Sequence, residues 1–248
     1  MTIKLPKKGE RASWIREFEV DGNVDKYNIQ PAPQTAPAQP NSVNTSQGNL
    51  NGFIYVPSIN LYVAKDRTLQ GRNWNDCQTR LHANGERMPT IPEFTEFLKY
   101  LRANSSGVKD ASQSEVTTIL DDILTVRSPY RAEWLDADFK VYKNGLNVNY
   151  YVFENGSIAQ KTEQLEDCLM KDKTPGIDLD SWLNNTTKQG LPKANVADGT
   201  IWYWFPRSDN NSVAWFFASS DRAGLSCGGN PADTDSSLGV RAIRRGSP

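Results

Sequence analysis

The stretch RNWNDCQTRLHANGERMPTIPEFTEF, residues 72–97, predicts two consecutive helices with a tight turn between them. In its first half Trp74, Cys77 and Leu81 recur at helical spacing, so one side of this segment is apolar. Gly85 follows, and a glycine commonly ends a helix because it adopts the left-handed conformation without strain. We therefore expect the first helix to end at Gly85.

The second half of the stretch predicts a helix that begins at Thr90. Thr90 and Glu93 have the spacing of a capping box, and Pro92 is favourable in the first turn. A third helix is expected over 112–125. The apolar stripes of these two helices consist of Ile91, Phe94, Phe97, Leu98 and Leu101, and of Val116, Ile119, Leu120, Ile123 and Leu124.

Strands are expected on both sides of the helices. The segments 53–56 and 61–63 precede them and are β-branched and aromatic. After them, the pairs Asn144-Gly145 and Asn155-Gly156 bracket the aromatic segment 148–153, which predicts hairpins. Further along, 171–199 has the composition of an irregular segment, and three more strands are predicted over 201–205, 212–218 and 238–243. This order predicts an α+β fold with two or three helices packed on antiparallel sheets.

The 248 residues divide into three parts by composition. Residues 30–51 are rich in Pro, Gln, Ala and Asn, which is typical of an extended linker. The linker separates an N-terminal segment, 1–29, from a principal domain, 52–245. Only the last part is long enough to bury a substantial core.

Charge, hydropathy and cysteine content exclude several classes of function. A net charge of −1 does not favour binding to nucleic acid, and no apolar run approaches the length of a membrane-spanning helix. Glu10 and Arg11 stand where a secretory signal would be apolar, so classical export is not expected, and the compartment stays unassigned. Cys77, Cys168 and Cys227 form no CxxC pair, so neither a disulfide framework nor a zinc site is indicated.

Several motifs, in this order along 53–244, resemble a known family. The passage 72–78 with Leu81, Gly85, 87–90 and 93–94 looks like the first-to-second-helix passage of C-type-lectin-like domains. The tail SSLGVR, 236–241, resembles the last strand of the branch that includes formylglycine-generating enzymes. Within that branch, the segments 134–136, 166–170, 189–192 and 213–216 look most like variable proteins of diversity-generating retroelements.

The resemblance implies a binding protein whose C-terminal codons are rewritten at template adenines. Asparagine codons altered at their adenines cannot encode Lys, Glu, Gln, Met or Trp. The chain holds 45 residues of these five types, and none lies among the 33 residues 216–248. A surface loop rich in Gly, Ser and Asp would have a similar composition, and this remains the alternative. The resemblance implies a variable region at about 203–237.

The residues themselves also favour display. The segment 217–230 is polar and rich in glycine, which is unsuited to a core strand, and loops on a rigid scaffold commonly bind ligands. We expect Trp202, Trp204 and Trp215 to form the framework, and Arg241 and Arg244 to hold the last strand, unless their charges are solvated. The expected ligand-binding residues are Phe217, Ser219, Ser220, Asp221, Arg222, Gly224, Ser226, Gly228, Gly229, Asn230, Asp233 and Asp235.

The expected partner is a protein or cell-surface ligand, and no cofactor is expected. Multivalent display or a homo-oligomer would raise the affinity of weak single contacts. Because export by a classical signal is not expected, the place of display would be a virion or a cell surface reached by another route.

The sequence supports a catalytic or metal-binding site less well than a ligand-binding surface. The lone histidine, His82, is expected to be structural, and no serine or cysteine has the context of a nucleophile. A formylglycine-generating enzyme would need a cysteine pair near the end, whereas Cys227 stands alone there, so no enzyme is expected. The paired aspartates are expected in caps or on solvated faces, and a solvated turn is preferred to a calcium site. The aspartates considered are Asp121, Asp122, Asp136, Asp138, Asp178 and Asp180 as pairs, and Asp233 and Asp235 near Asn230 as cation ligands. An enzyme of the formylglycine-generating type or an ordinary lectin-like module remain the alternatives.

Overall fold

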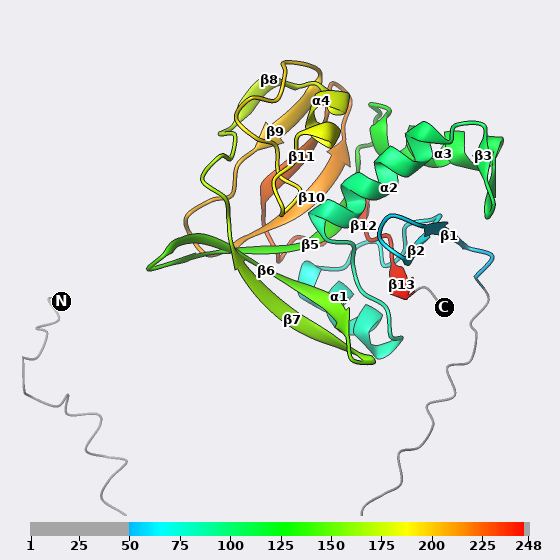
Figure 1. Cartoon of the computed structure of the whole chain (residues 1–248), viewed down its shortest axis with the longest axis horizontal. Coiled ribbons are helices and arrows are strands. Elements are labelled where there is room, and N and C mark those ends of the chain that lie inside the picture. Colours follow the sequence, from blue (N-terminus) through cyan, green and yellow to red (C-terminus); the bar gives the residue numbers. More distant parts are fainter. Residues whose placement is uncertain (1–49, 246–248) are drawn as a thin grey trace, which may run out of the picture. The chain divides into compact units, whose positions relative to one another are not determined.

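The stretch 72–97 forms two helices in the computed structural model, which describes residues 50–245 (Figure 1). The helix α1 spans Trp74–Ala83, and Asn73 caps it by accepting a hydrogen bond from the Asp76 amide at 2.8 Å. Gly85 has a φ of +70°, and its amide donates to the His82 carbonyl at 3.0 Å. The expected end of the first helix is thus confirmed.

Two further helices also begin as expected. In α2, Thr90 and Glu93 form both hydrogen bonds of a capping box, and Ser112 and Glu115 do the same for α3. Their apolar stripes turn inward, because every third or fourth residue faces the core. A fourth helix, α4, lies in the segment expected to be irregular, so that prediction was wrong there. The bounds are α2 Ile91–Ala103, α3 Gln113–Leu124 and α4 Leu179–Asn184, with the short paired strands β3 Gly107–Val108 and β4 Ala111–Ser112 between α2 and α3.

The large sheet has the strand order β7-β6-β5-β10-β11-β9-β8. Neighbours along this path are antiparallel except β11 and β9, which are parallel, and β12 also pairs in parallel with the beginning of β5. The expectation of antiparallel final strands therefore holds for β10 on both sides and for β9 where it meets β8, but not where β9 meets β11 or β12 meets β5. The bounds are β5 Arg131–Tyr142, β6 Gly145–Glu154, β7 Ser157–Gln164, β8 Lys173–Ile177, β9 Ile201–Trp204, β10 Ser212–Ala218, β11 Ala223–Gly229 and β12 Leu238–Gly239.

A small sheet brings the beginning and the end of the domain together. It has the order β1-β2-β13, with β1 at Phe53–Val56, β2 at Leu61–Ala64 and β13 at Ile243–Arg245. The single strand predicted over 238–243 is therefore wrong, because β12 joins the large sheet and β13 the small one. Arg241 lies between them, and its side chain is buried among backbone carbonyls and acids.

Both Asn-Gly pairs lie at hairpin turns, as predicted. Asn155 and Gly156 have φ angles of +45° and +83°. Positive φ at both residues gives a two-residue turn whose twist matches the right-handed twist of the flanking strands β6 and β7. Gly145, at the β5–β6 turn, has a φ of +114°. The α+β class is confirmed, whereas the expected parts 1–29 and 30–51 lie outside the described residues apart from Leu50 and Asn51.

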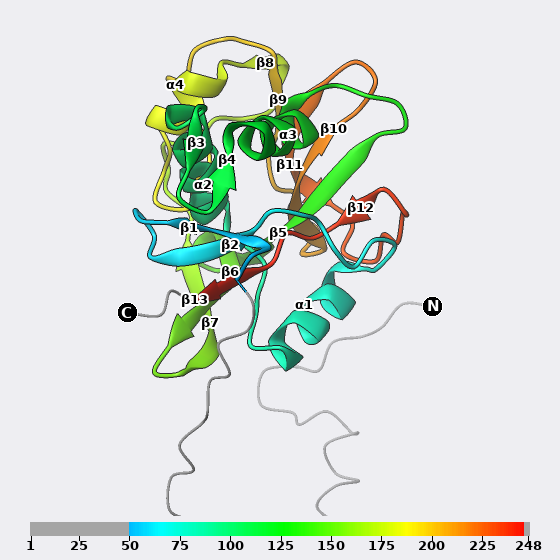
Figure 2. The same cartoon turned by 90° about the vertical axis from the view of Figure 1, so that its right-hand side faces the viewer.

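The large sheet is covered on both faces. On one face, α2, α3 and α4 pack with buried residues such as Leu135, Phe216 and Leu225. On the other, α1 and the C-terminal segment pack with Trp134 and Val213. Figure 2 shows α1 on one side of β5 and the helices α2 and α3 on the other. Among residues 50–245, no helix has the length and apolar character that crossing a membrane requires.

Candidate functional site

The second face of the sheet is left partly open over β9, β10 and β11. Along these strands alternate residues point to opposite faces, so Tyr203, Phe216 and Leu225 enter the core. Their neighbours Trp204, Phe217 and Ser226 are half-buried on the opposite face. The open face therefore carries a row of aromatic side chains beside a strand of small residues.

These side chains enclose a groove of about 490 Å³. The Trp204 and Phe217 ring centroids are 5.5 Å apart, Trp202 lies 5.4 Å from Trp204, and Trp215 stacks on Trp134 at 5.3 Å. The Trp215 indole nitrogen is buried and has no hydrogen-bond partner among the described residues. The groove is lined by Tyr130, Asp172, Trp204, Phe205, Arg207, Trp215, Phe217, Ser226 and Gly228.

The floor of the groove is the strand β11, which sequence reasoning had excluded from the core. That exclusion was wrong, because β11 is a central strand with Leu225 and Cys227 fully buried beneath it. Two of its glycines, Gly224 and Gly229, lie where the backbone of β11 closely approaches the backbones of β9 and β10, respectively. A Cβ at Gly224 would lie 2.5 Å from the Trp202 carbonyl oxygen, and one at Gly229 would lie 2.9 Å from the Val213 carbonyl oxygen.

Gly224 and Gly229 are consequently buried and cannot contribute to the exposed surface that we expected. Gly228 differs from them, since a Cβ there would meet only the Arg207 side chain, at 3.5 Å, which is an ordinary contact. Of the predicted residues on β10 and β11, Phe217, Ser226 and Gly228 are the ones that line the groove.

The tip of the β10–β11 hairpin presents four more of the predicted residues. The Ser219 amide donates to the Arg222 carbonyl at 2.7 Å, which closes the turn around Ser220 and Asp221. The Arg222 guanidinium pairs with Asp221, lowers the pKa of that carboxyl, and lies 4.0 Å from the centre of the Trp202 ring. The tip and the aromatic row are thus continuous.

The last three predicted residues lie in the loop after β11 and organise its turns. Asn230 accepts a hydrogen bond from the Ala232 amide, Asp233 from Asp235, and Asp235 from Ser237. Within the described chain no group of three or more His, Cys, Asp or Glu side chains could hold a metal ion. Asp233 and Asp235 therefore act as local turn acceptors here.

The tryptophans were assigned to the framework, and Trp215 does pack on the buried Trp134, but two of the three also form part of the open surface. Trp204 and Trp215 line the groove, and Trp202 extends the row at half burial. Sequence reasoning also missed Tyr130, Asp172, Phe205 and Arg207, which reach the groove from three separate segments. A usable signal was the alternation of Ile201 and Tyr203 with the two tryptophans of β9, which places the latter on one face.

Residues considered for chemistry lie elsewhere. His82 packs edge-on against Tyr151 with ring centroids 4.6 Å apart, and burial lowers its pKa. Asp178 caps α4 through the Ser181 amide, as expected for a cap. Asp136, expected on a solvated face, is instead fully buried, and burial raises its pKa to about 8. Burial also raises the pKa of Cys227, whose thiol lies on the core side of β11.

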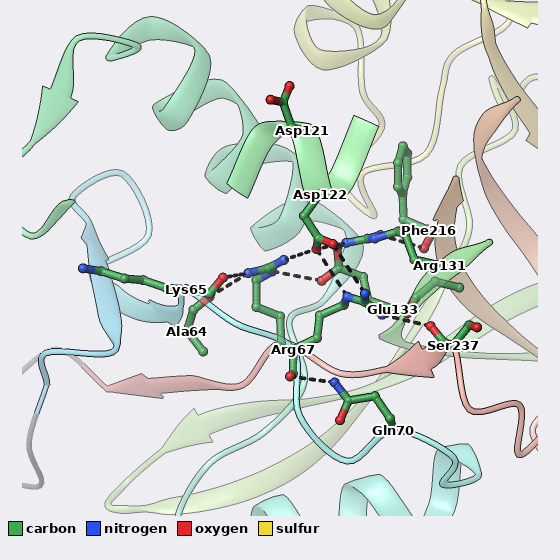
Figure 3. Close-up of polar contacts among 12 residues, drawn as sticks. Ala64, Lys65, Arg67, Gln70, Asp121, Asp122, Arg131, Glu133, Phe216 and Ser237 are labelled. Carbon is green, nitrogen blue, oxygen red and sulfur yellow. Dashed lines mark hydrogen bonds and ion pairs between the residues drawn. The ribbon is translucent and has the colours of Figure 1, made fainter. Parts of the chain in front are cut away.

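The last strands are held by a cluster of buried charges (Figure 3). Arg241 donates to Glu133 at 3.0 Å, to Asp122 at 3.2 Å and to two backbone carbonyls beside β2, and Arg244 pairs with Glu86. The expected anchoring role of both arginines is confirmed. Comparison of the chain with protein-family models, with curated proteins and with solved structures finds no match.

Proposed function

We propose that this chain is a variable ligand-binding protein of the diversity-generating-retroelement type, with a C-type-lectin-like fold that recognises a protein or cell-surface receptor. The observation that carries the proposal is the open groove over β9, β10 and β11. Three positions of the segment that lacks Lys, Glu, Gln, Met and Trp, namely Phe217, Ser226 and Gly228, line it.

The composition of the groove suits a division between constant and exchangeable residues. Trp204 and Trp215 lie outside the codon-restricted segment and would be constant walls, since tryptophan is not reached from asparagine codons by change at adenine. Large aromatic side chains in a concave, partly desolvated surface are the usual anchors of a binding site. The exchangeable side chains would then select among receptors that all use the same aromatic platform.

The hairpin tip extends this surface. The side chains of Ser219, Asp221 and Arg222 form hydrogen bonds among themselves, and Arg222 lies over the Trp202 ring. The bond to another segment, from the Arg127 amide to the Ser219 carbonyl at 2.7 Å, involves backbone alone, so it does not depend on the side chain. Substitutions at exposed positions of this kind usually change stability by less than about 0.5 kcal/mol. The tip can therefore vary while the fold is retained.

Sequencing of this gene and its flanks in independent isolates tests the proposal. We expect a near-copy of the codons for 216–241 beside a reverse transcriptase, with differences confined to positions where the copy has adenine. Codons for Ser219, Asp221 and Ser226 should vary, whereas those for Gly224 and Gly229 should be constant because a side chain there meets backbone. Substitutions spread evenly through the gene, or a variable Gly224 codon, would count against the proposal.

A protein-level test uses a combined substitution of Ser219, Asp221 and Arg222 by alanine. We expect the midpoint of thermal unfolding to change by no more than about 2 °C, because the residues make no buried contact. A large loss of stability would show that the hairpin tip is structural. Binding of copper by Cys227, together with turnover of a cysteine-containing peptide, would favour an enzyme of the formylglycine-generating type instead.

A further inference from the structure

Four guanidinium groups converge on one carboxylate at the end of α3. Asp122 lies 2.9 Å from Arg131, 3.2 Å from Arg241, 3.3 Å from Arg67 and 3.6 Å from Arg127. Figure 3 shows Arg67 and Arg131 reaching Asp122 from different strands and loops. This meeting point links β2, α3, β5 and the C-terminal segment.

The cluster carries more positive than negative charge. Glu133 is its only other carboxylate among the described residues, and it is fully buried between Arg131 and Arg241. Although burial opposes ionisation, Arg241 and Arg131 lower the pKa of Glu133, and Arg131 and Arg67 lower that of Asp122 to about 2. Both acids are therefore ionised at neutral pH, and four guanidinium charges face two carboxylates.

A surface cavity of about 550 Å³ lies against the surplus positive charge. Three of the four arginines, Arg67, Arg127 and Arg131, contribute to its wall. The rest of the cavity is lined by Ser128, Ser236 and Ser237 together with Gln70, Thr125, Pro129 and Tyr130. Such walls offer hydrogen-bond donors around an electropositive space.

The arginines retain unused donors. Arg131 has 2% of its surface exposed, and its Nε has no hydrogen-bond partner within residues 50–245. The Arg127 Nη1 lies 3.6 Å from Asp122 and donates to no carbonyl in that part of the chain, while its Nε and Nη2 donate to backbone. An orphaned buried donor of this kind is costly unless a ligand or water supplies an acceptor.

The other acids nearest to the cavity are Asp121, Asp233 and Asp235, and they differ in where they lie relative to its positive charge. Asp121 points away from the cluster (Figure 3). Asp233 and Asp235 lie on the Tyr130 side, where burial and then Asp235 raise the pKa of Tyr130 to about 12. An anion in the cavity would thus be attracted by the arginines and weakly repelled from the rim formed by the 230–237 loop.

We propose that this cavity binds a small oxyanion, such as a carboxylate, sulfate or phosphate group. Arg127 and Arg131 supply charge-assisted hydrogen bonds, and the serine hydroxyls complete the contacts. Tyr130 lines both this cavity and the aromatic groove. If the proposed ligand-binding function holds, the oxyanion is an acidic group of the ligand that fills the groove, held by arginines that lie outside the codon-restricted segment.

Titration of the full-length chain with sodium sulfate, phosphate and acetate, followed by calorimetry at constant ionic strength in chloride, tests the anion site directly. We expect saturable binding with one site per chain. Arg127→Gln should weaken it about tenfold, because a charge-assisted hydrogen bond and a unit charge are lost at the mouth of the cavity. Arg127→Lys keeps the charge and should weaken binding about threefold, since the planar fork is lost.

Matched variants separate a built site from general surface charge. Arg102 is as exposed as Arg127, with 36% of each side chain accessible, and it pairs with Asp180 outside the linings of both the cavity and the groove. Arg102→Gln should therefore leave the dissociation constant of each anion within about twofold. Asp235→Asn keeps the oxygen that accepts from the Ser237 amide but removes the repulsive charge, and should tighten binding about twofold to threefold.

Non-saturable heats, or equal weakening by Arg127→Gln and Arg102→Gln, would overturn the proposal. The preference among the three salts identifies the kind of oxyanion. Tighter binding of acetate indicates a carboxylate, and tighter binding of sulfate or phosphate indicates a tetrahedral sulfate or phosphate group. The test involves only inorganic ions, acetate and described side chains, so its outcome is independent of whether the C-terminal codons vary.

Discussion

Replacing Gly224 by alanine has two opposing effects on the free energy of unfolding, a steric cost in the folded state and an entropic gain from the unfolded chain. In an open strand position Gly→Ala stabilises a protein by about 0.4–1 kcal/mol, because the unfolded chain loses freedom. Here the new Cβ would lie 2.5 Å from the Trp202 carbonyl oxygen and 3.1 Å from both the carbonyl carbon and the Cβ of Trp202. The obstacle is backbone of the parallel neighbour β9, which cannot rotate away as a side chain could.

Relief therefore requires β9 and β11 to separate, which strains several hydrogen bonds of their parallel pairing. Overpacking of a rigid site typically costs about 1–3 kcal/mol, so the steric term is the larger one. We expect Gly224→Ala to lower the free energy of unfolding by about 2 kcal/mol, equivalent to roughly 4–8 °C for a domain of this size.

Equilibrium unfolding in urea, followed by tryptophan fluorescence and circular dichroism, measures this loss. Gly228→Ala is the matched control on the same strand, because its Cβ would meet only the flexible Arg207 side chain at 3.5 Å. The control should remain within about 0.5 kcal/mol of the unmodified chain. Equal stability of the two variants would refute the assignment of β11 as a closely packed central strand.

Three further substitutions test other parts of the molecule. Glu133→Gln should lower the free energy of unfolding by about 3–5 kcal/mol, since two buried guanidinium groups lose their shared carboxylate, and urea unfolding measures it. Because the folded-state pKa of Asp136 is raised to about 8, the folded chain binds a proton that the unfolded chain releases near pH 4, so stability should fall as pH rises from about 4 to 8. Asp136→Asn should flatten this slope in urea unfolding at pH 5, 6.5 and 8, and parallel curves for both chains would contradict the raised pKa. Thr90→Ala should cost about 1 kcal/mol by removing the capping box with Glu93, whereas Thr79→Ala, which removes an exposed hydroxyl bonded to the preceding helical turn, should cost less than about 0.5 kcal/mol.

The groove and the proposed anion cavity share the lining residue Tyr130 and would bind different parts of one ligand. Tyr130 stands between an aromatic platform and an arginine-rich pocket, so a ligand with a flat apolar part and an acidic group would engage both. The three arginines of the proposed anion cavity belong to the ion-pair cluster around Asp122. The residues of the hairpin tip contact little else, which leaves them free to change.

The sequence by itself determined the local structure of the helices and the tight turns. Thr90 with Glu93, Ser112 with Glu115, and Gly85 act within one or two helical turns, so their residue types predict where α1 ends and where α2 and α3 begin. Runs of β-branched and aromatic residues likewise predicted β1 and β2, and the strand expected over 212–218 is β10. These features depend on neighbours in the chain, which a sequence shows directly.

Only the tertiary structure decided which face of each strand is open and which strands are central. β11 has the composition of a loop, yet it lies between β9 and β10 because its glycines allow their backbones to approach. Trp204 and Trp215 have the residue type of a core, yet both are half-buried and line a groove. Pairing and coverage depend on segments far apart in the chain, and local composition carries no record of them.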